Sequence, residues 1–249
     1  MKRLGDFTFA RVGLERSGNA LATREVLAFQ LAHAMARDAV HHPFDAGALL
    51  LECQTRAWPV LVAHSAAGDR AEYLRRPDLG RRLAKGAILE ADGDRDLAIV
   101  IADGLSALAV HRHAIPLLEG LIPLFDEGAW TRTPIVIVQQ GRVAIGDEIG
   151  HRLRASMALM LIGERPGLSS PDSLGAYLTW NPVHGRTDAE RNCISNIRPE
   201  GLRYENAAHR IFTLLNEARR RKLTGVRLKE GQGYPGKNPE SFSLPSSNT

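Results

Sequence analysis

The chain has 249 residues, of which 44% are hydrophobic, 24% charged and 6% aromatic, a composition that excludes a disordered protein. This length allows one large domain, or a body with a smaller lobe. The net charge of +4 and the pI of about 9.3 raise the possibility of nucleic-acid binding. The arginine clusters lack interleaved stacking aromatics, however, so we expect no nucleic-acid partner.

Cysteine content and hydropathy exclude further classes. Cys53 and Cys193 are the only cysteines, with no CxxC motif and no Cys/His pair at zinc spacing. The sequence therefore predicts neither a disulfide scaffold nor a structural zinc. No stretch approaches the roughly 18 uninterrupted apolar residues of a membrane span. We expect a cytoplasmic protein without a membrane partner.

The N-terminal part has helical periodicity. Apolar side chains recur at helical spacing in residues 23–42, where Pro43 ends the pattern. The stretches 46–53 and 78–89 show the same helical pattern. Residues 1–92 are therefore predicted to form a smaller helical lobe.

Strand and helix patterns alternate from residue 96 onwards. Three short, continuous apolar runs have the character of buried strands, and two helical patterns separate them. The strands are 97–102, 134–138 and 157–162, and the helices are 107–125, with Pro116 marking a break or a second start, and 145–154. This order predicts an α/β domain over 93–229, with a parallel Rossmann-like sheet and helices on both of its faces.

The C-terminal part consists of one helix and a tail. Residues 204–223 form an amphipathic pattern that ends in basic residues, as suits a helix C-terminus. Residues 230–249 contain Pro, Gly, Ser and Asn with little to bury. We expect this tail to be flexible.

The loops that leave the carboxyl ends of parallel strands meet at one edge of a sheet, where ligands bind. Their Gly, Ser, Asn, Arg and Glu content allows the backbone to approach a ligand while polar groups converge on it. Four segments are predicted to lie at this edge: 103–106, 140–143, 163–167 and 192–196.

Most motifs of enzyme chemistry are absent. Residues 167–171 fail the G-x-S-x-G pattern of serine hydrolases, and no G-x-G-x-x-G follows the first predicted strand. The histidines form no metal signature. Cys193 and His184 are compatible with a Cys/His pair, but a lone cysteine is more often a small packed hydrophobe, which is the interpretation we favour.

Two carboxylates at the predicted edge are open to different interpretations. Glu164 follows a buried strand, where it is placed either to accept hydrogen bonds from a ligand or to form an ion pair with Arg165 or Arg142. The residues alone do not separate these two roles. Asp103 and Ser106 are interpreted mainly as caps of the following helix.

Five motifs in a fixed order carry a family resemblance. They are LRRPDLGRRL (74–83), DGLS (103–106), GRV (141–143), GERPGL (163–168) and CISNI (193–197). Together they resemble the small, or light, subunit of ethanolamine ammonia-lyase, over residues 10–228. The fourth and fifth motifs are the specific ones.

The resemblance implies a subunit of an adenosylcobalamin-dependent lyase that converts ethanolamine to acetaldehyde and ammonia by a radical route. It implies a large subunit that holds the substrate and carries the main catalytic residues, within a higher hetero-oligomer. The cobalamin is expected between the two chains. Its contacts on this chain are expected at Val143, Glu164 and Cys193, with Asp103, Ser106 and Arg142 as secondary candidates.

Two further expectations follow from the resemblance. The chain has no Asp-x-His-x-x-Gly segment, by which other corrinoid proteins replace the cofactor's own base, so that base is expected to stay on cobalt. Some family members begin with an additional segment that directs them to a bacterial microcompartment. This chain starts almost at the first shared motif, so encapsulation is open to question.

Two alternatives remain open from the sequence. The first is a nucleotide- or sugar-phosphate-binding α/β protein that acts without a partner. The second is a structural chaperone for the large subunit that makes no contact with the cofactor.

Overall fold

The computed structural model describes residues 11–228, which form six α-helices, eight strands and two short 3-10 helices. The strands are β1 (Arg16–Ser17), β2 (Ala20–Leu21), β3 (Val60–His64), β4 (Arg95–Ala102), β5 (Ile135–Gln139), β6 (Ala155–Gly163), β7 (Leu174–Trp180) and β8 (Arg191–Ile197). The helices are α1 (Thr23–His41), α2 (Ala46–Thr55), α3 (Arg70–Arg75), α4 (Ala107–Glu127), α5 (Ile145–Arg152) and α6 (Tyr204–Arg221), with the 3-10 turns η2 (Leu79–Arg81) and η3 (Asp188–Glu190).

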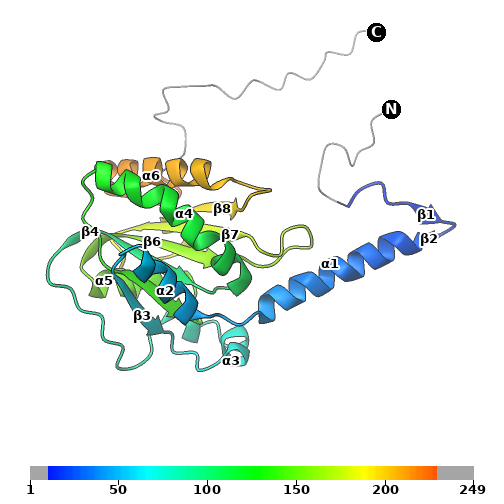
Figure 1. Cartoon of the computed structure of the whole chain (residues 1–249), viewed down its shortest axis with the longest axis horizontal. Helices are drawn as coiled ribbons and strands as arrows, with labels where there is room; N and C mark the ends of the chain where they lie inside the picture. Colours follow the sequence, from blue (N-terminus) through cyan, green and yellow to red (C-terminus); the bar gives the residue numbers. More distant parts are fainter. Residues whose placement is uncertain (1–10, 229–249) are drawn as a thin grey trace, which may run out of the picture.

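A mixed six-stranded sheet in the order β3-β5-β4-β6-β7-β8 forms the centre of the molecule (Figure 1). The first four strands of this order are parallel, whereas β7 is antiparallel to both β6 and β8. The chain steps from β4 to β5 on one side and then to β6 on the other, so the strand order reverses at β4. Such a reversal is where α/β sheets usually bind ligands.

Helices cover both faces of the sheet because the buried strands are apolar on both faces. The larger apolar cluster packs α2, α4 and α6 against one face, and α4 and α6 lie side by side there (Figure 1). The smaller cluster packs α5 against the other face. Leu97, Ile99 and Ile101 of β4 point into the first cluster, and Val100 and Ala102 into the second.

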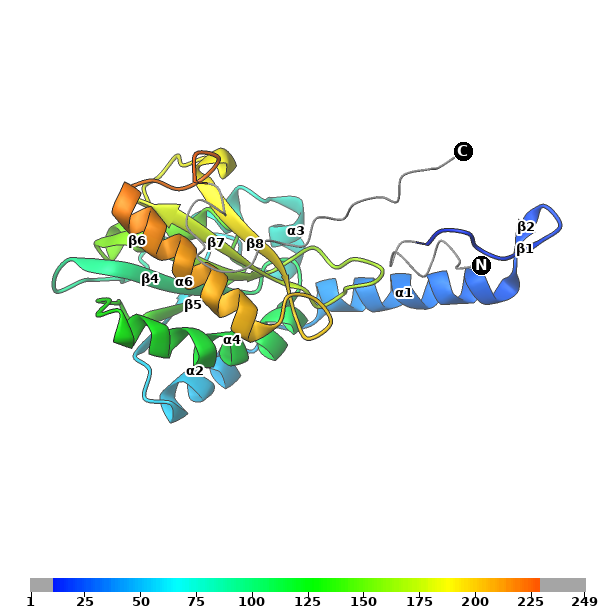
Figure 2. The ribbon, with the colours of Figure 1, turned by 90° about the horizontal axis from the view of Figure 1, so that it is seen from above.

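Helix α1 projects away from this body as a long arm, and the short β1-β2 hairpin lies at its far end (Figure 2). Ala39, near its C-terminal end, is the one buried residue of the helix. No helix in residues 11–228 is both long and apolar enough to cross a bilayer.

The α/β class is confirmed, but three details of the sequence prediction are wrong. The sheet is mixed, since β7 and β8 add an antiparallel pair next to β6. Residues 78–89 contain only the turn η2, because the carbonyl of Gly80 and the amide of Leu83 bond to the loop after β5 and to α5. Helix α4 runs through Pro116 unbroken, since burial of its neighbours outweighs the lost backbone bond.

The predicted helical lobe 1–92 contributes a strand to the sheet, because β3 pairs in parallel with β5. The proposed boundary near residue 92 stays a prediction. Residues 230–249, predicted to be a flexible tail, lie outside the described residues.

Candidate functional site

The loops after β4 and β6 touch each other at the carboxyl edge of the parallel strands. Gly104 has a φ of +57°, and a Cβ on either Gly104 or Gly163 would collide with the backbone of the other loop. The amide of Leu105 donates to the carbonyl of Gly163 at 2.9 Å. The backbones of the two loops therefore close the crevice between β4 and β6, and a ligand must bind elsewhere along this edge.

Asp103 joins the loop after β4 to the loop after β5. Its carboxylate is 1% exposed and accepts hydrogen bonds from the amide of Gly141 at 3.0 Å and from Arg70 at 3.3 Å. Burial raises the pKa of Asp103 to about 6, although the nearby Arg70 guanidinium opposes the shift. A carboxylate enclosed in this way positions the two loops and has no open side for a ligand.

Ser106, rather than Asp103, caps helix α4. Its hydroxyl accepts from the amide of Ala109 at 3.3 Å and donates to the carbonyl of Pro171 at 3.0 Å. The predicted cap is therefore confirmed for Ser106 and wrong for Asp103.

The motif at 74–83 supports the loop after β5. The amide of Arg142 donates to the carbonyl of Gly80 at 2.7 Å, and its guanidinium lies 4.1 Å from the centre of the Tyr73 ring. Tyr73 is fully buried and donates from its hydroxyl to the carbonyl of Gly141 at 3.2 Å. Arg142 therefore anchors the loop to α3.

Val143 lies between this anchored loop and the start of α5. It is half-buried and packs against the apolar cluster under α5, and its carbonyl accepts from the amide of Gly146 at 3.1 Å. Its remaining surface faces outward at the carboxyl edge of β5, as the sequence predicted.

Glu164 follows β6 directly and is held by two hydrogen bonds. Its Oε2 accepts from the Ser173 hydroxyl and from the amide of Asn196, the latter at 3.2 Å. Within residues 11–228, Glu164 has no ion pair with Arg165 or Arg142, and no hydrogen bond occupies its Oε1. The ion-pair interpretation is therefore wrong, and one carboxylate oxygen remains as an acceptor.

Cys193 does not lie in a strand-end loop as predicted. It is inside β8, four residues before that strand ends at Ile197, and it is exposed. Ile194 points into the cluster with α4 and α6, so Cys193 points to the α5 face. The favoured interpretation as a packed hydrophobe is thus wrong for Cys193, whereas Cys53 is buried. Its thiol lies 3.3 Å from the Ser195 hydroxyl.

Tyr177 links these positions, and the sequence reasoning missed it. It pairs with Cys193 across β7 and β8 and packs against the same apolar cluster as Val143. Its pKa is raised by burial and then by Cys193 and Glu164. A Cβ on Gly175 would lie 3.0 Å from the Glu164 carboxylate and 3.2 Å from the Tyr177 ring, so these two side chains lie close together. The β-forming residues of β7, followed by Asn181 and Pro182, were the signal that could have revealed this strand.

Val143, Glu164 and Cys193 therefore lie around one corner of the α5 side, where β7 and β8 extend the sheet. A polar hollow of about 460 Å³ opens beside Glu164 and also involves Ser173, Asn196 and Arg198. The larger cavity, about 660 Å³, contains Trp58 and Trp130 and lies at the opposite edge, where β4 and β5 begin. Its position separates it from every predicted site residue.

The described residues offer no cluster of His, Cys, Asp or Glu able to hold a metal ion. His111 accepts a hydrogen bond from the amide of Asp45 at 3.0 Å, and His113 bonds the Tyr204 hydroxyl at 2.8 Å. The two histidines therefore serve different contacts, as their spacing predicted.

Comparison with known proteins identifies relatives that match nearly the whole chain. A family model described as "Ethanolamine ammonia-lyase light chain" matches residues 1–229. An ethanolamine ammonia-lyase small subunit of Pseudomonas aeruginosa is 54% identical over 248 residues, covering 96% of this chain and 91% of the relative. The small subunit of Ralstonia nicotianae is 56% identical over 235 residues, covering 92% and 87%. That of Xanthomonas campestris pv. campestris is 54% identical over 240 residues, covering 94% and 88%.

Proposed function

Because the chain belongs to the ethanolamine ammonia-lyase light chain family, we propose that it is the small subunit of an adenosylcobalamin-dependent ethanolamine ammonia-lyase. In this function it binds the cobalamin jointly with a large subunit, which carries the substrate site. The observation that supports a shared cofactor is that the half-buried Val143, the acceptor oxygen of Glu164 and the exposed Cys193 lie on the same side of the sheet.

The chemistry of this corner suits a cobalamin. The corrin ring is rimmed with amide side chains, whose N–H groups need acceptors, and Glu164 has an acceptor oxygen beside a polar hollow. The ring itself is large and partly apolar. The backbones of Glu164 and Cys193 lie about 13 Å apart along the strand direction, since Glu164 is level with Ser173 and Cys193 is level with Tyr177, four residues further along β7. A small ligand would not need residues so widely spaced.

Each residue has a separate role in this proposal. Glu164 accepts hydrogen bonds from the amides or from a ribose hydroxyl of the cofactor. Val143 supplies backbone groups and apolar contact, and Cys193 packs against the cofactor with its thiol as a weak donor. Tyr177 forms the surface between Glu164 and Cys193.

When bound, the cofactor supplies a cobalt–carbon bond whose homolysis starts radical chemistry. The residues of this chain position the cofactor and cover one side of it. Domain 93–229 holds the cofactor, with β3 completing the sheet.

Reconstitution with the large subunit tests the function. Deamination of ethanolamine is expected only when the chain, the large subunit and adenosylcobalamin are combined. Activity of the chain alone, or full activity of the large subunit without it, would contradict the assignment.

Substitution of Glu164 tests the cofactor contact. Glu164→Ala is expected to weaken cobalamin binding to the assembled complex by about 1–3 kcal/mol, because a hydrogen-bonded carboxylate is lost. Glu164→Gln, which keeps an acceptor oxygen, should lose less. Titration of the complex with cobalamin measures both.

Glu200→Ala is the matched control, because Glu200 lines the same hollow but its side chain is 72% exposed. It should bind cobalamin like the wild type. If Glu164→Ala also leaves the affinity unchanged while the complex assembles, the chain has a structural role without this cofactor contact.

A further inference from the structure

Helix α1 is the largest part of the described chain that has almost no support from the rest. It has 19 residues, and Ala39 alone is buried. At its outer end, Arg11 donates to the carbonyl of Ala28 and lies over the Phe29 ring, which covers one side of the helix only. A single helix of this length is marginal in water without tertiary packing.

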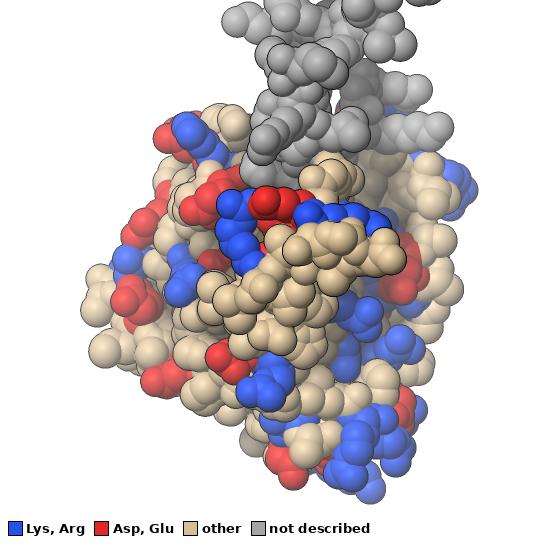
Figure 3. Space-filling view, turned by 90° about the vertical axis from the view of Figure 1, so that its right-hand side faces the viewer, with Lys and Arg blue, Asp and Glu red and all other residues tan. Residues whose placement is uncertain are grey.

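The exposed part of α1 carries large apolar side chains in a stripe. Leu27, Leu31 and Met35 follow one another at intervals of four residues, so they lie along one side of the helix. They are 58%, 63% and 51% exposed. Polar Gln30 and Arg37 lie about 100–120° around the helix from the middle of this stripe. Phe29 and Val26, which are 46% and 38% exposed, lie roughly opposite the stripe. Seen from the end of the arm, uncharged side chains cover much of the projecting part (Figure 3).

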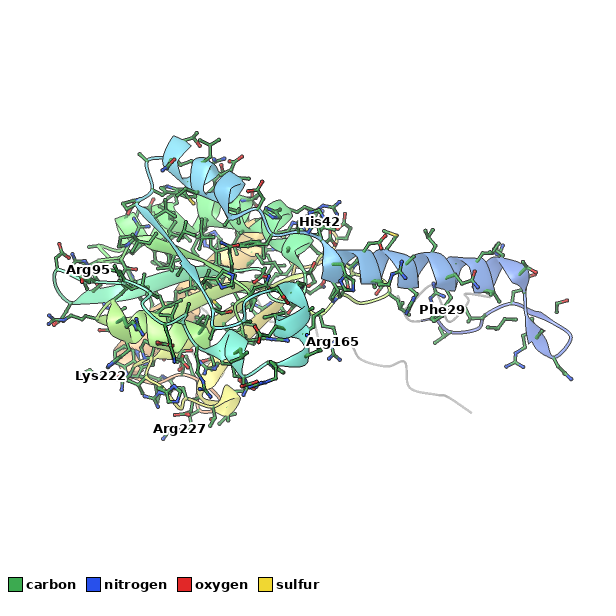
Figure 4. The ribbon with its side chains drawn as sticks, turned by 90° about the horizontal axis from the view of Figure 1, so that it is seen from below. Phe29, His42, Arg95, Arg165, Lys222 and Arg227 are labelled. Carbon is green, nitrogen blue, oxygen red and sulfur yellow. The ribbon has the colours of Figure 1, made fainter. Side chains whose placement is uncertain are left out.

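The arm leaves the body at the edge that carries the candidate site. Arg70 donates to the carbonyl of Val40, near the end of α1, at 2.9 Å, and to the carbonyl of Gly104, in the loop after β4, at 2.7 Å. His42 and Arg165, the neighbour of Glu164, both lie at the base of the arm, whereas Phe29 lies far out on it (Figure 4). The helix thus extends past the carboxyl edge into the space that a partner covering this edge must occupy.

On the basis of the function proposed above, we propose that α1 is a docking arm for the large subunit. A cofactor held between two chains brings the large subunit to the carboxyl edge, and α1 is the apolar element that projects there. The stripe of Leu27, Leu31 and Met35 packs into an apolar groove of that subunit. A stripe of large apolar side chains along one side of an exposed helix is typical of helix-in-groove recognition.

The test compares two double variants of the full chain. Leu31→Glu/Met35→Glu places charges in the stripe, and Gln30→Glu/Arg37→Glu places them outside the stripe, on a polar flank of the same helix. Each is titrated with purified large subunit, and complex formation is measured by sedimentation. Thermal unfolding of each chain alone reports whether the body remains folded, as expected for exposed positions.

The stripe variant is expected to raise the dissociation constant about tenfold or more, since buried apolar anchors dominate such interfaces. Gln30→Glu/Arg37→Glu should stay within about threefold of the wild type. Equal binding by both variants would overturn the docking arm while leaving the proposed function intact. The same holds if the stripe variant alters only self-association of this chain. Failure of the wild-type chain to bind the large subunit would overturn both.

Discussion

Asp103 shows how a single buried charge organises the site. Its carboxylate accepts hydrogen bonds from the amide of Gly141 and the guanidinium of Arg70, and so joins the loop after β4 to the loop after β5 and to α3. It is a positioning residue. Burying Asp103 costs electrostatic free energy, because burial disfavours the charged form of the carboxylate.

The pH dependence of stability should report this cost. The pKa of Asp103 is about 6 in the folded chain, against about 3.9 in an unfolded chain. The folded state therefore binds more protons between these values, and the stability contributed by Asp103 is full below about pH 4 and lost as the pH rises through about 6. Relative to Asp103→Asn, the wild type should lose about 3 kcal/mol of unfolding free energy over this range. Urea unfolding at several pH values measures it, and parallel profiles would contradict a buried, titrating Asp103.

Glu164 and Cys193 differ in what their neighbours in sequence reveal. Glu164 follows an unmistakable buried strand, so its place at the edge could be predicted. Cys193 sits in the segment RNCISNI, in which apolar and polar residues do not alternate as they do in a half-buried strand. Its position depends on β7, which was not predicted, and so its place in the sheet could not be inferred.

At the scale of elements, the contact between the loops after β4 and β6 determines where the site can be. Gly163 lies against the carbonyls of Asp103 and Ser106, so the loop after β6 turns outward toward β7 and β8. This close approach directs Glu164 toward Ser173 and Asn196.

Gly163→Ala is therefore expected to destabilise the fold by about 2 kcal/mol or more, because its Cβ would lie 2.6 Å from the Asp103 carbonyl oxygen. Gly120→Ala in α4 is the matched control. Its Cβ would meet Ala208 at an ordinary 3.6 Å, so it should stabilise by about 0.5–1 kcal/mol. Denaturant unfolding compares the two, and an equal effect would show that the loops do not pack so closely.

A buried ion pair connects β8 to α5. Arg191 binds Asp147 through two hydrogen bonds of 2.6 Å, and the two side chains are 2% and 3% exposed. Arg191 also donates to the Thr179 hydroxyl of β7 at 2.9 Å. This pair holds the edge strand that carries Cys193.

Arg191→Met should destabilise the chain by about 3–5 kcal/mol, because it leaves the Asp147 charge buried and unpaired. Adding Asp147→Leu should restore much of the loss. Urea unfolding of the single and double variants makes the comparison. A single variant as stable as the wild type would mean that β8 does not depend on this pair.

At the scale of the whole molecule, the chain combines a well-packed body with a projecting helix. The body buries both faces of its central strands, whereas α1 depends on little more than its own hydrogen bonds. Such a division is expected in a subunit that completes its packing in a complex.

Hydrogen exchange should reveal this division. In the chain alone, amides of α1 between residues 24 and 37 are expected to exchange about 100-fold or more faster than those of β4 and β6, since few apolar contacts oppose local opening. Mass spectrometry of peptic fragments measures the rates. Protection of α1 equal to that of the central strands would indicate packing that the described residues lack.

The sequence by itself determined the α/β class, the three central parallel strands, the helices α1, α2, α4, α5 and α6, and the family. These features depend on local periodicity and on short motifs, which can be recognised from residues close together in the sequence. Only the tertiary structure decided the antiparallel addition of β7 and β8, the exposure of Cys193, the role of Tyr177 and the projection of α1. Each of these depends on which surfaces meet, and edge pairing and helix docking follow from contacts between residues far apart in sequence.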